Sequence, residues 1–361
     1  MNTIKNLTLL FISLLLFTCN SSDDSSEPSF KVNLLVTDIV NQNILPSVDN
    51  FVSESISLNT AVEAYLETLT EVDLEILRAQ WQVSAKAYGS IYAFNIGDVR
   101  GQFMHQALFN WPTLPTAIEN ILTNNDEITE TLMLSLSPQI KTLSGLEYLL
   151  FGDDLAVVNA GFIASEKRRD YLKYTALELK SQSERLQIIW GTLNSGAYAT
   201  TFINNEEAGI KSSFNLLYNG LFNLIDNAKI TKIGKPAGLE NSENTNPEIS
   251  QAYFSHTSLK ILENNIKSIE AVYFNPKGLG ISDYVYATVD NEDLNNAIET
   301  KIAEVYAAID GIPTNFYTAI SSNPIEVKTL HEKLNELGVL FSVDVRSILS
   351  IIITTTDNDG D

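Results

Sequence analysis

Glu147 is the residue of this sequence whose type and surroundings point most clearly to chemistry. It is the only charged residue between Leu143 and Gly152, where the others are apolar, aromatic or small. As a helix, this segment is apolar on every side, which is typical of a buried helix. A buried carboxyl group must be hydrogen-bonded, ion-paired, protonated or bound to a cation. Glu147 is therefore a candidate ligand-binding, metal-binding or catalytic residue, and a hydrogen bond or arginine pair within the core is the structural alternative.

The three histidines and the acidic C-terminus do not complete a metal site at any recognisable spacing. His331 begins a segment like a zincin helix, but Asn335 stands where the second histidine belongs. His105 has no acidic or cysteine ligand at a useful spacing, and His256 stands at a helix seam where packing is the favoured interpretation. The terminal run 357–361, Asp-Asn-Asp-Gly-Asp, has its glycine in fourth place and ends before a calcium loop is complete. We interpret it as a solvated acidic terminus.

The elements that must position these residues are helices. Apolar or small residues recur at alternating steps of three and four, the period of helices in bundles. Strands need a period of two, which only the residues from Ser350 to Thr356 suggest. The sequence therefore predicts an all-α fold with a short extended segment near the C-terminus. The five series are Leu74, Leu77, Trp81, Ser84, Tyr88 and Ile91; Leu172, Ala176, Leu179, Ser183, Leu186, Trp190 and Leu193; Ile210, Phe214, Leu217, Leu221, Leu224 and Ala228; Ala252, Ser255, Leu259, Leu262, Ile266, Ile269 and Tyr273; and Val327, Leu330, Leu334, Leu337 and Phe341.

Capping and breaking residues suggest where these helices begin and bend. Asp73 is expected to cap the helix of the first series. Asn246 followed by Pro247 is expected to cap the helix of the fourth series, with the proline at its first position. Pro46 should interrupt and kink the opening helix.

Helix number and length favour two four-helix bundles side by side. The break between them is expected from Asn194 to Asn205 or in the loop from Lys232 to Asn246. We assign residues 31–195 to an N-terminal bundle and residues 196–361 to a C-terminal bundle.

The first eighteen residues have the composition of an export signal. Lys5 gives a short positive start, an apolar run from Leu7 to Phe17 follows, and Cys19 is the only cysteine of the chain. The run is too short to span a bilayer and suits a signal peptide of residues 1–18. The arrangement resembles a bacterial lipobox, in which the cysteine is lipidated; a plain secretory peptide is the alternative. Residues 19–30 are polar and acidic, which predicts a flexible tether.

The charge balance argues against several classes of partner. The chain has 45 acidic and 23 basic residues, a formal net charge of −22. Nucleic-acid binding is driven by lysines and arginines that displace counterions from phosphates, and no basic patch interrupts the acidity. We therefore expect no nucleic acid partner and no attraction to anionic lipid headgroups, and we attribute most of the charge to solubility.

An ordered set of motifs along the chain resembles the imelysin family. The resemblance covers nearly all of the chain after the leader. It implies a pair of all-helical bundles in an exported bacterial protein. The family is named for an insulin-cleaving membrane protease, is classed among metallopeptidases, and has relatives linked to iron uptake. The motifs are Trp81 with Tyr88, Phe94-Asn95-Ile96-Gly97, Trp111-Pro112-Thr113, Leu146 to Gly152, Arg169-Asp170-Tyr171-Leu172, Lys232 to Gly238, and Phe254 to Leu259.

The family signature is Gly-x-His-x-x-Glu, and its alignment on Glu147 places Thr142 at the glycine and Ser144 at the histidine. An imidazole is the best nitrogen ligand for zinc or iron. Its replacement implies that a metal at Glu147 would have mainly oxygen ligands, which favour hard cations. The resemblance makes Glu147, Ser144, Ser255 and Ser258 the candidate ligand-binding residues. The group that pairs with the buried carboxylate of Glu147 is expected to come from the second bundle, in the turn from Ser255 to Ser258.

The favoured function is an exported, non-catalytic, imelysin-like lipoprotein that binds a ligand or ion in the cell envelope, with a link to iron uptake. The alternatives are a metallopeptidase that uses Glu147 as base or ligand, and a surface interaction protein without a small-ligand site. No cofactor is assigned beyond a metal ion as a candidate. The chain is expected to be lipid-anchored in the cell envelope, most simply in the outer membrane of a Gram-negative bacterium. An envelope or iron-uptake protein is the candidate partner.

We predict that Cys19 is acylated. It ends the apolar leader and has no second cysteine with which to form a disulfide. In cells fed a labelled fatty acid, the wild-type chain should take up label and Cys19→Ala should take up none. Label retained by the variant would show that Cys19 is not the lipidated residue.

Overall fold

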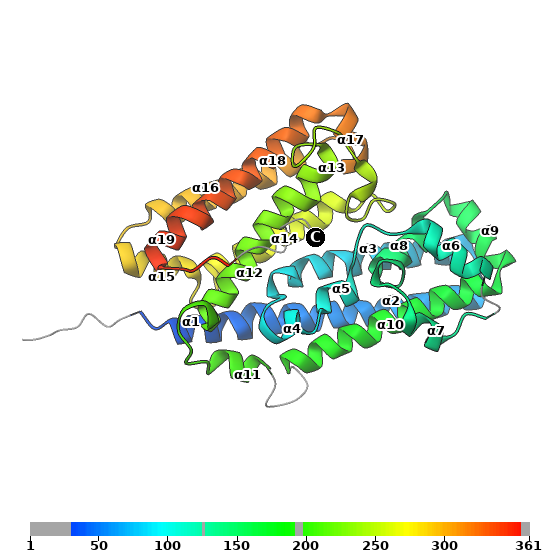
Figure 1. The fold of residues 1–361 in the computed structure, drawn as a ribbon, viewed down its shortest axis with the longest axis horizontal. Coiled ribbons are helices and arrows are strands. Elements are labelled where there is room, and N and C mark those ends of the chain that lie inside the picture. The colour runs from blue at the N-terminus through cyan, green and yellow to red at the C-terminus, as the bar shows by residue number, and fades with distance from the viewer. Residues whose placement is uncertain (1–29, 125–126, 192–197, 355–361) are drawn as a thin grey trace, which may run out of the picture. The chain divides into compact units, whose positions relative to one another are not determined.

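Every regular element in the described part of the chain, which comprises residues 30–124, 127–191 and 198–354 of this computed structural model, is helical (Figure 1). The predicted all-α fold is confirmed. The long helices are α2 (Leu45–Thr68), α3 (Glu71–Ile91), α10 (Glu166–Trp190), α12 (Ser213–Asn227), α14 (Ser258–Phe274), α16 (Asp293–Asp310) and α18 (Pro324–Val339). The shorter ones are α1 (Val32–Ile39), α4 (Gly97–Gly101), α5 (Met104–Leu108), α6 (Pro115–Asn124), α7 (Glu130–Ser135), α8 (Leu143–Phe151), α9 (Leu155–Ala164), α11 (Tyr198–Ile203), α13 (Lys235–Ala237), α15 (Ile281–Val289), α17 (Phe316–Ser322) and α19 (Arg346–Leu349).

The helices gather into two groups. In the first, α2 packs against both α3 and α10, and α8 and α9 lie on α3. In the second, α18 packs against α16 and α12, and α14 packs against α16. The contact of α14 with α3 joins the groups, which belong to one compact unit that begins at Lys31. Figure 1 shows the first group below and the second above. The predicted boundary at residue 195, the leader and the terminal acidic run lie outside the described residues, and the division into two bundles there stays a prediction.

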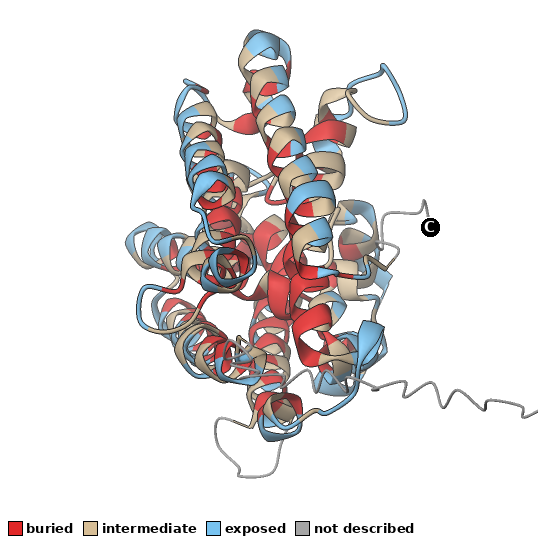
Figure 2. Ribbon diagram, turned by 90° about the vertical axis from the view of Figure 1, so that its left-hand side faces the viewer, coloured by how far each residue is buried: buried red, intermediate tan, exposed pale blue. Residues whose placement is uncertain are grey.

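The predicted apolar series form most of the core. Figure 2 shows the buried residues on the helix sides that face one another. The first series is buried throughout, and aromatic rings fill the space beside it. The Trp81 ring meets the Phe151 ring edge-on at 5.4 Å between centroids, and the Tyr88 ring meets that of Phe109 in the same way at 5.4 Å. The series in α10, α12 and α18 are also buried where they are helical and described.

Two series were extended too far at their N-terminal ends. Ile210 is 48% exposed and lies in a separate 3-10 turn, η4 (Gly209–Lys211). Ala252 and Ser255 are buried but precede α14, in a turn rather than a helix. The backbones of Ala252 and His256 both have φ of 56°, the left-handed region, so the right-handed helix cannot begin before them.

The helix starts also differ in detail. Thr70, not Asp73, is the N-cap of α3, and its hydroxyl accepts the backbone N–H of Asp73 at 3.2 Å. Asp73 occupies the third helical position, where its carboxylate accepts hydrogen bonds from Thr70 and Thr68, each at 2.6 Å. Pro247 does begin a helical turn, but it is the 3-10 helix η6 (Pro247–Ile249), which ends before α14.

π-helical segments interrupt three of the helical runs. The first, η1 (Val40–Ile44), joins α1 to α2 and ends two residues before Pro46, the second residue of α2. Proline lacks an N–H, so it cannot continue the regular hydrogen-bond ladder of the helix. The other two are η5 (Ala228–Gly234) after α12 and η7 (Leu340–Val345) after α18.

The segment expected to be extended, 350–356, is described as far as residue 354 and contains no strand there. Its backbone is paired by side chains of α12. The Asn215 amide donates to the Ile352 carbonyl at 3.0 Å and accepts the Ile352 N–H at 2.9 Å. The Asn219 oxygen accepts the N–H of Thr354 at 2.8 Å. Two asparagines one turn apart thus supply the bonds that a neighbouring strand would supply. Across the described residues, no helix combines the length and the apolar composition that crossing a membrane requires.

We predict that Leu179→Ala and Leu262→Ala each lower the free energy of unfolding by roughly 2–5 kcal/mol, the usual range for a buried leucine. Both side chains are 1% exposed. Ile188→Ala, also in α10 but 52% exposed, should change it by less than about 0.5 kcal/mol. Urea denaturation would measure all three. Equal effects at Leu179 and Ile188 would contradict the assignment of the α10 core face.

Candidate functional site

The short helix α8 carries Glu147 into the interior. Thr142 caps the helix, and its hydroxyl accepts the backbone N–H of Ser144 at 3.3 Å. On α3, the indole N–H of Trp81 donates to the carbonyl of Leu143 at 3.1 Å, which fixes α8 against the longer helix. All residues of α8 up to position 150 are buried except the one at position 148. The side chain of Glu147 is therefore buried, as the apolar residues around it in the sequence predicted.

Glu147 is 2% exposed and is held by Ser255 from the second group of helices. The backbone N–H and the hydroxyl of Ser255 both donate to Oε1 of Glu147, each at 2.8 Å. The expected contact between Glu147 and the Ser255–Ser258 turn is therefore present. It joins residues 108 positions apart in the chain.

The turn that presents Ser255 is shaped by its own hydrogen bonds. The Ala252 carbonyl accepts the N–H of Thr257 at 3.3 Å, and the Thr257 hydroxyl donates to the Ser255 carbonyl at 3.2 Å. The Ser258 hydroxyl donates to the carbonyl of Gln251. These bonds close the turn around the left-handed residues at its two ends, so the N–H and hydroxyl of Ser255 point the same way.

The surroundings of Glu147 favour its neutral form. Burial raises the pKa of Glu147 from its usual 4.5 to about 7. The N–H and hydroxyl of Ser255 and the N–H of Phe254 lower the pKa in part, because they bind the charged form. No charged side chain among the described residues contributes, so the arginine pair considered as an alternative is not found in that part of the chain. At neutral pH the carboxyl group is therefore shared between its two protonation states.

Lys232, a second buried ionisable group, was missed in the sequence. It lies in the π-helical segment η5 and is 4% exposed. Its amine donates to the side-chain oxygen of Asn265, and the Tyr92 and Trp111 ring centroids lie 4.8 Å and 5.6 Å from Nζ. Burial lowers the pKa of Lys232 to about 7 from its usual 10.5, and no carboxylate in the described structure counters this. The motif from 232 to 238 contained the lysine, but nothing in its spacing indicated a buried amine.

Ser144 and Ser258 do not share the hydrogen bonds of Glu147. The Ser144 hydroxyl donates to the carbonyl of Asn110, and the Ser258 hydroxyl donates to its own turn. Thr113 completes the contact with α8 by donating to the Ser144 carbonyl at 3.1 Å. Of the four candidate residues, the structure thus joins Glu147 and Ser255 directly and places the other two in backbone contacts beside them. Their role in ligand binding stays a prediction.

The histidines occupy three different surroundings. His331 Nε2 lies 2.9 Å from a carboxylate oxygen of Glu240. His256 is exposed, and its ring stacks on that of Tyr317 at 6.3 Å. His105 Nδ1 lies 2.9 Å from the amide nitrogen of Asn95. Within the described ranges, no group of three or more histidine, cysteine, aspartate or glutamate side chains is arranged to hold a metal ion.

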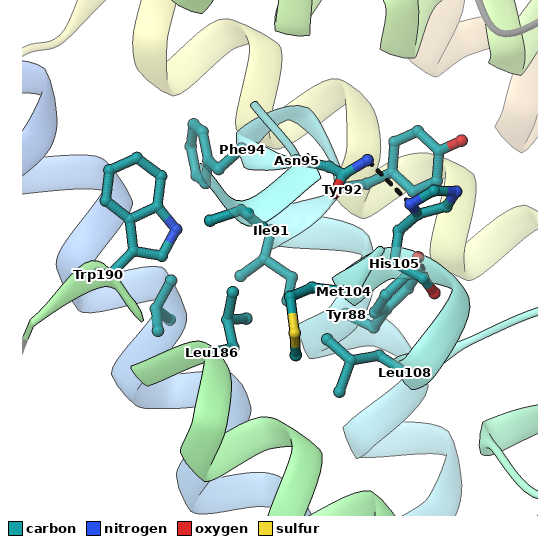
Figure 3. A pocket seen from close by; sticks show the side chains of 12 residues that line it. Tyr88, Ile91, Tyr92, Phe94, Asn95, Met104, His105, Leu108, Leu186 and Trp190 are labelled. Atoms are coloured by element: carbon teal, nitrogen blue, oxygen red, sulfur yellow. Dashed lines mark hydrogen bonds between the residues drawn. The ribbon is translucent and has the colours of Figure 1, made fainter. Parts of the chain in front are cut away.

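A mainly apolar cavity lies beside the Asn95–His105 pair and offers only about 20 Å³ to the centres of water-sized spheres. Figure 3 shows Leu186 and Trp190 on one side of it and Met104 on another, with the Asn95–His105 hydrogen bond at its edge. Glu147 and Lys232 do not line it. Its narrow, apolar interior suits packing more than chemistry, so we take the two buried ionisable groups, Glu147 and Lys232, each in its own surroundings, as the candidate functional residues.

The family model of imelysin matches residues 44–341, most of the chain. The chain belongs to the imelysin family. Two solved structures share the fold of this imelysin-family protein. One is a Parabacteroides distasonis protein provisionally named iron-regulated protein A precursor, with a TM-score of 0.73, 20% identity, and coverage of 88% of this chain and 94% of that one. The other is an imelysin-like protein from Psychrobacter arcticum, with a TM-score of 0.73, 16% identity, and coverage of 90% and 96%. None of the curated proteins matches the chain.

We predict that Glu147→Gln removes a pH dependence of stability. Because the folded pKa is raised, the folded state keeps a proton that the unfolded state releases between pH 4.5 and about 7. The stability that this proton contributes is complete below pH 4.5 and is lost as pH rises through about 7. Relative to Glu147→Gln, the wild type should lose roughly 3 kcal/mol of unfolding free energy between pH 4 and pH 8.

Urea denaturation at pH 4, 6 and 8 would measure this difference. Glu67→Gln, at an exposed position of α2, is the matched control and should track the wild type. A constant difference between wild type and Glu147→Gln across this range would contradict the raised pKa of Glu147.

Proposed function

We infer that this imelysin-family protein binds a small ligand or ion in its interior and does not catalyse a reaction. The observation that carries this inference is the burial of Glu147 and Lys232, neither of which has an oppositely charged partner among the described residues. Burying an ionisable group without a partner costs several kcal/mol. Stability alone does not favour two such groups, whereas perturbed ionisable groups gather at functional sites.

The contacts at Glu147 favour binding over peptidase action. A zinc peptidase holds its metal with three protein ligands and keeps one position open for water. Glu147 is instead bound through Oε1 by a backbone N–H and a hydroxyl, both hydrogen-bond donors rather than metal ligands. Ser144, which we align with the signature histidine, already donates its hydroxyl to a backbone carbonyl. These contacts support a carboxyl group that accepts hydrogen bonds, and a metal there would have mainly oxygen ligands.

We propose that the chain is lipid-anchored through Cys19 in the cell envelope, in the outer membrane of a Gram-negative bacterium. The leader sequence supports this location. A link to iron uptake is supported by the family and by the name of the Parabacteroides distasonis protein of the same fold. An envelope or iron-uptake protein is the partner that fits this role. The surface interaction protein without a small-ligand site remains the second candidate, since the Glu147–Ser255 contact also joins the two helix groups.

We predict that the purified protein holds no stoichiometric zinc and cleaves no peptide in a zinc-dependent manner. It should instead retain a small bound species that is lost in Glu147→Gln and in Lys232→Met but kept in Glu67→Gln. Elemental analysis, native mass spectrometry of protein purified from cell envelopes, and a peptide cleavage assay would measure these three properties.

The outcomes separate the candidate functions. Stoichiometric zinc that is lost in Glu147→Gln together with peptide cleavage would show that the protein is a metallopeptidase. A wild-type protein with no bound species, and with the same mass as both interior variants apart from the substitutions, would favour the surface interaction protein.

A further inference from the structure

A second, polar cavity lies where residues 92–105 of the first helix group meet α12 of the second. Its lining includes Asn95, His105, Gly220, Asn223 and Asn227. It offers about 50 Å³ to the centres of water-sized spheres, which is room for several waters or a small hydrated ion. Neither Glu147 nor Lys232 lines it, so it is distinct from the site described above.

Three amide oxygens of this cavity are left without hydrogen bonds. They belong to Asn95, Asn223 and Asn227, and each is a buried atom that receives no hydrogen bond in the described structure. Buried polar atoms are nearly always paired, and each unpaired one costs about 1–3 kcal/mol. One such oxygen is an ordinary exception, but three around one cavity point to a shared occupant.

The fold brings these oxygens together from separate segments. Asn223 and Asn227 are one turn apart on α12 and therefore lie on one face of that helix. Gly220 precedes them on the same face, and a Cβ atom there would lie 2.2 Å from the carbonyl oxygen of Ala93. The glycine thus lets α12 approach the segment that ends at Asn95. The amide nitrogen of Asn95 faces His105, as Figure 3 shows, which leaves the Asn95 oxygen for the cavity.

A small cation is the ligand that several neutral oxygen atoms would bind. Hard cations bind carbonyl-type oxygens, and divalent ions usually need carboxylates as well. Among the described residues, no carboxylate lines this cavity. The net charge of −22 raises the local concentration of cations around the protein. Lys232 lies over the ring of Tyr92, which also lines the cavity, but its amine donates to Asn265.

We propose that the cavity formed by Asn95, Asn223 and Asn227 is a binding site for a monovalent cation, either an alkali ion or ammonium. The site is independent of the proposed ligand site at Glu147. An ion that binds only the folded state stabilises it by mass action, so its chloride salt should raise the melting temperature. At constant ionic strength, the purified protein should melt about 2 °C higher in sodium, potassium or ammonium chloride than in choline chloride, whose cation is too large for the cavity.

Two variants of α12 test the location. The double variant Asn223→Leu, Asn227→Leu should lose the difference between salts. Asn227→Asp should bind the favoured ion several-fold more tightly, because a carboxylate replaces a neutral oxygen, and the midpoint of the salt titration should fall. Asn296→Asp, which adds the same charge at an exposed position of α16, should leave that midpoint unchanged. Glu147→Gln should keep the ion effect, whatever becomes of the ligand site.

Equal melting temperatures in all four salts would overturn the proposal, and the cavity would then hold water only. An ion effect that survives in the double variant, or that Asn296→Asp alters as much as Asn227→Asp does, would place the ion elsewhere and would also overturn it. If the double variant does not fold, the comparison of the two aspartate variants decides between these outcomes. The ammonium and alkali arms identify which cation the site prefers.

Discussion

The hydrogen bonds between Ser255 and Glu147 are the interaction on which the arrangement of the two helix groups depends. A carboxyl group on a helix that is buried on all sides must find donors, and α8 itself offers none. The donors come from a turn that only two left-handed residues make possible. That turn leads directly into α14, which packs against α3, the helix that also holds α8 through Trp81. The Glu147–Ser255 hydrogen bonds and the packing of α14 on α3 therefore hold the two helix groups together at the same interface.

The interior contains one acidic and one basic group, Glu147 and Lys232, whose pKa values burial shifts to about 7, and neither has an oppositely charged partner among the described residues. For Glu147 the folded state gains stability at low pH. For Lys232 the sign is reversed, because the folded state releases a proton that the unfolded state keeps. Its contribution is complete above pH 10.5 and is lost as pH falls through about 7. Near neutral pH both contributions are largely lost, so a ligand that binds either charged form there would restore stability. The free energy that ligand binding would contribute could thus offset the destabilisation caused by burying these two groups.

Periodicity revealed the helices and most of the core, because a buried face repeats along the chain whatever its partners are. It also identified Glu147, since a lone charge in an apolar helix is visible in one segment. The Ser255 contact was expected from a family resemblance, and periodicity wrongly placed that serine inside a helix. A left-handed residue such as Ala252 or His256 has no reliable signal in a sequence, because tertiary contacts select it.

Other features depend on contacts between distant segments and left no local pattern. Lys232 lies in a π-helical segment, where the extra residue per turn shifts side chains off the α-helical period. A lysine there looks like any surface lysine. The cavity oxygens of Asn95 and Asn227 belong to segments more than a hundred residues apart, so only the fold brings them together. The role of Asp73 was misjudged for a simpler reason, since Thr70 and Asp73 are both good residues for a helix start and share it.

The central claim is that Glu147 is a buried carboxyl group near its midpoint at neutral pH. The most direct measurement is a pH titration of its side-chain carboxyl carbon by NMR in ¹³C-labelled protein, with the resonance assigned by its absence in Glu147→Gln. The structure predicts a midpoint at about pH 7, well above the usual 4.5. A midpoint near 4.5 would show that Glu147 is charged and solvated like a surface glutamate, which would contradict a buried carboxyl group that is partly protonated at neutral pH.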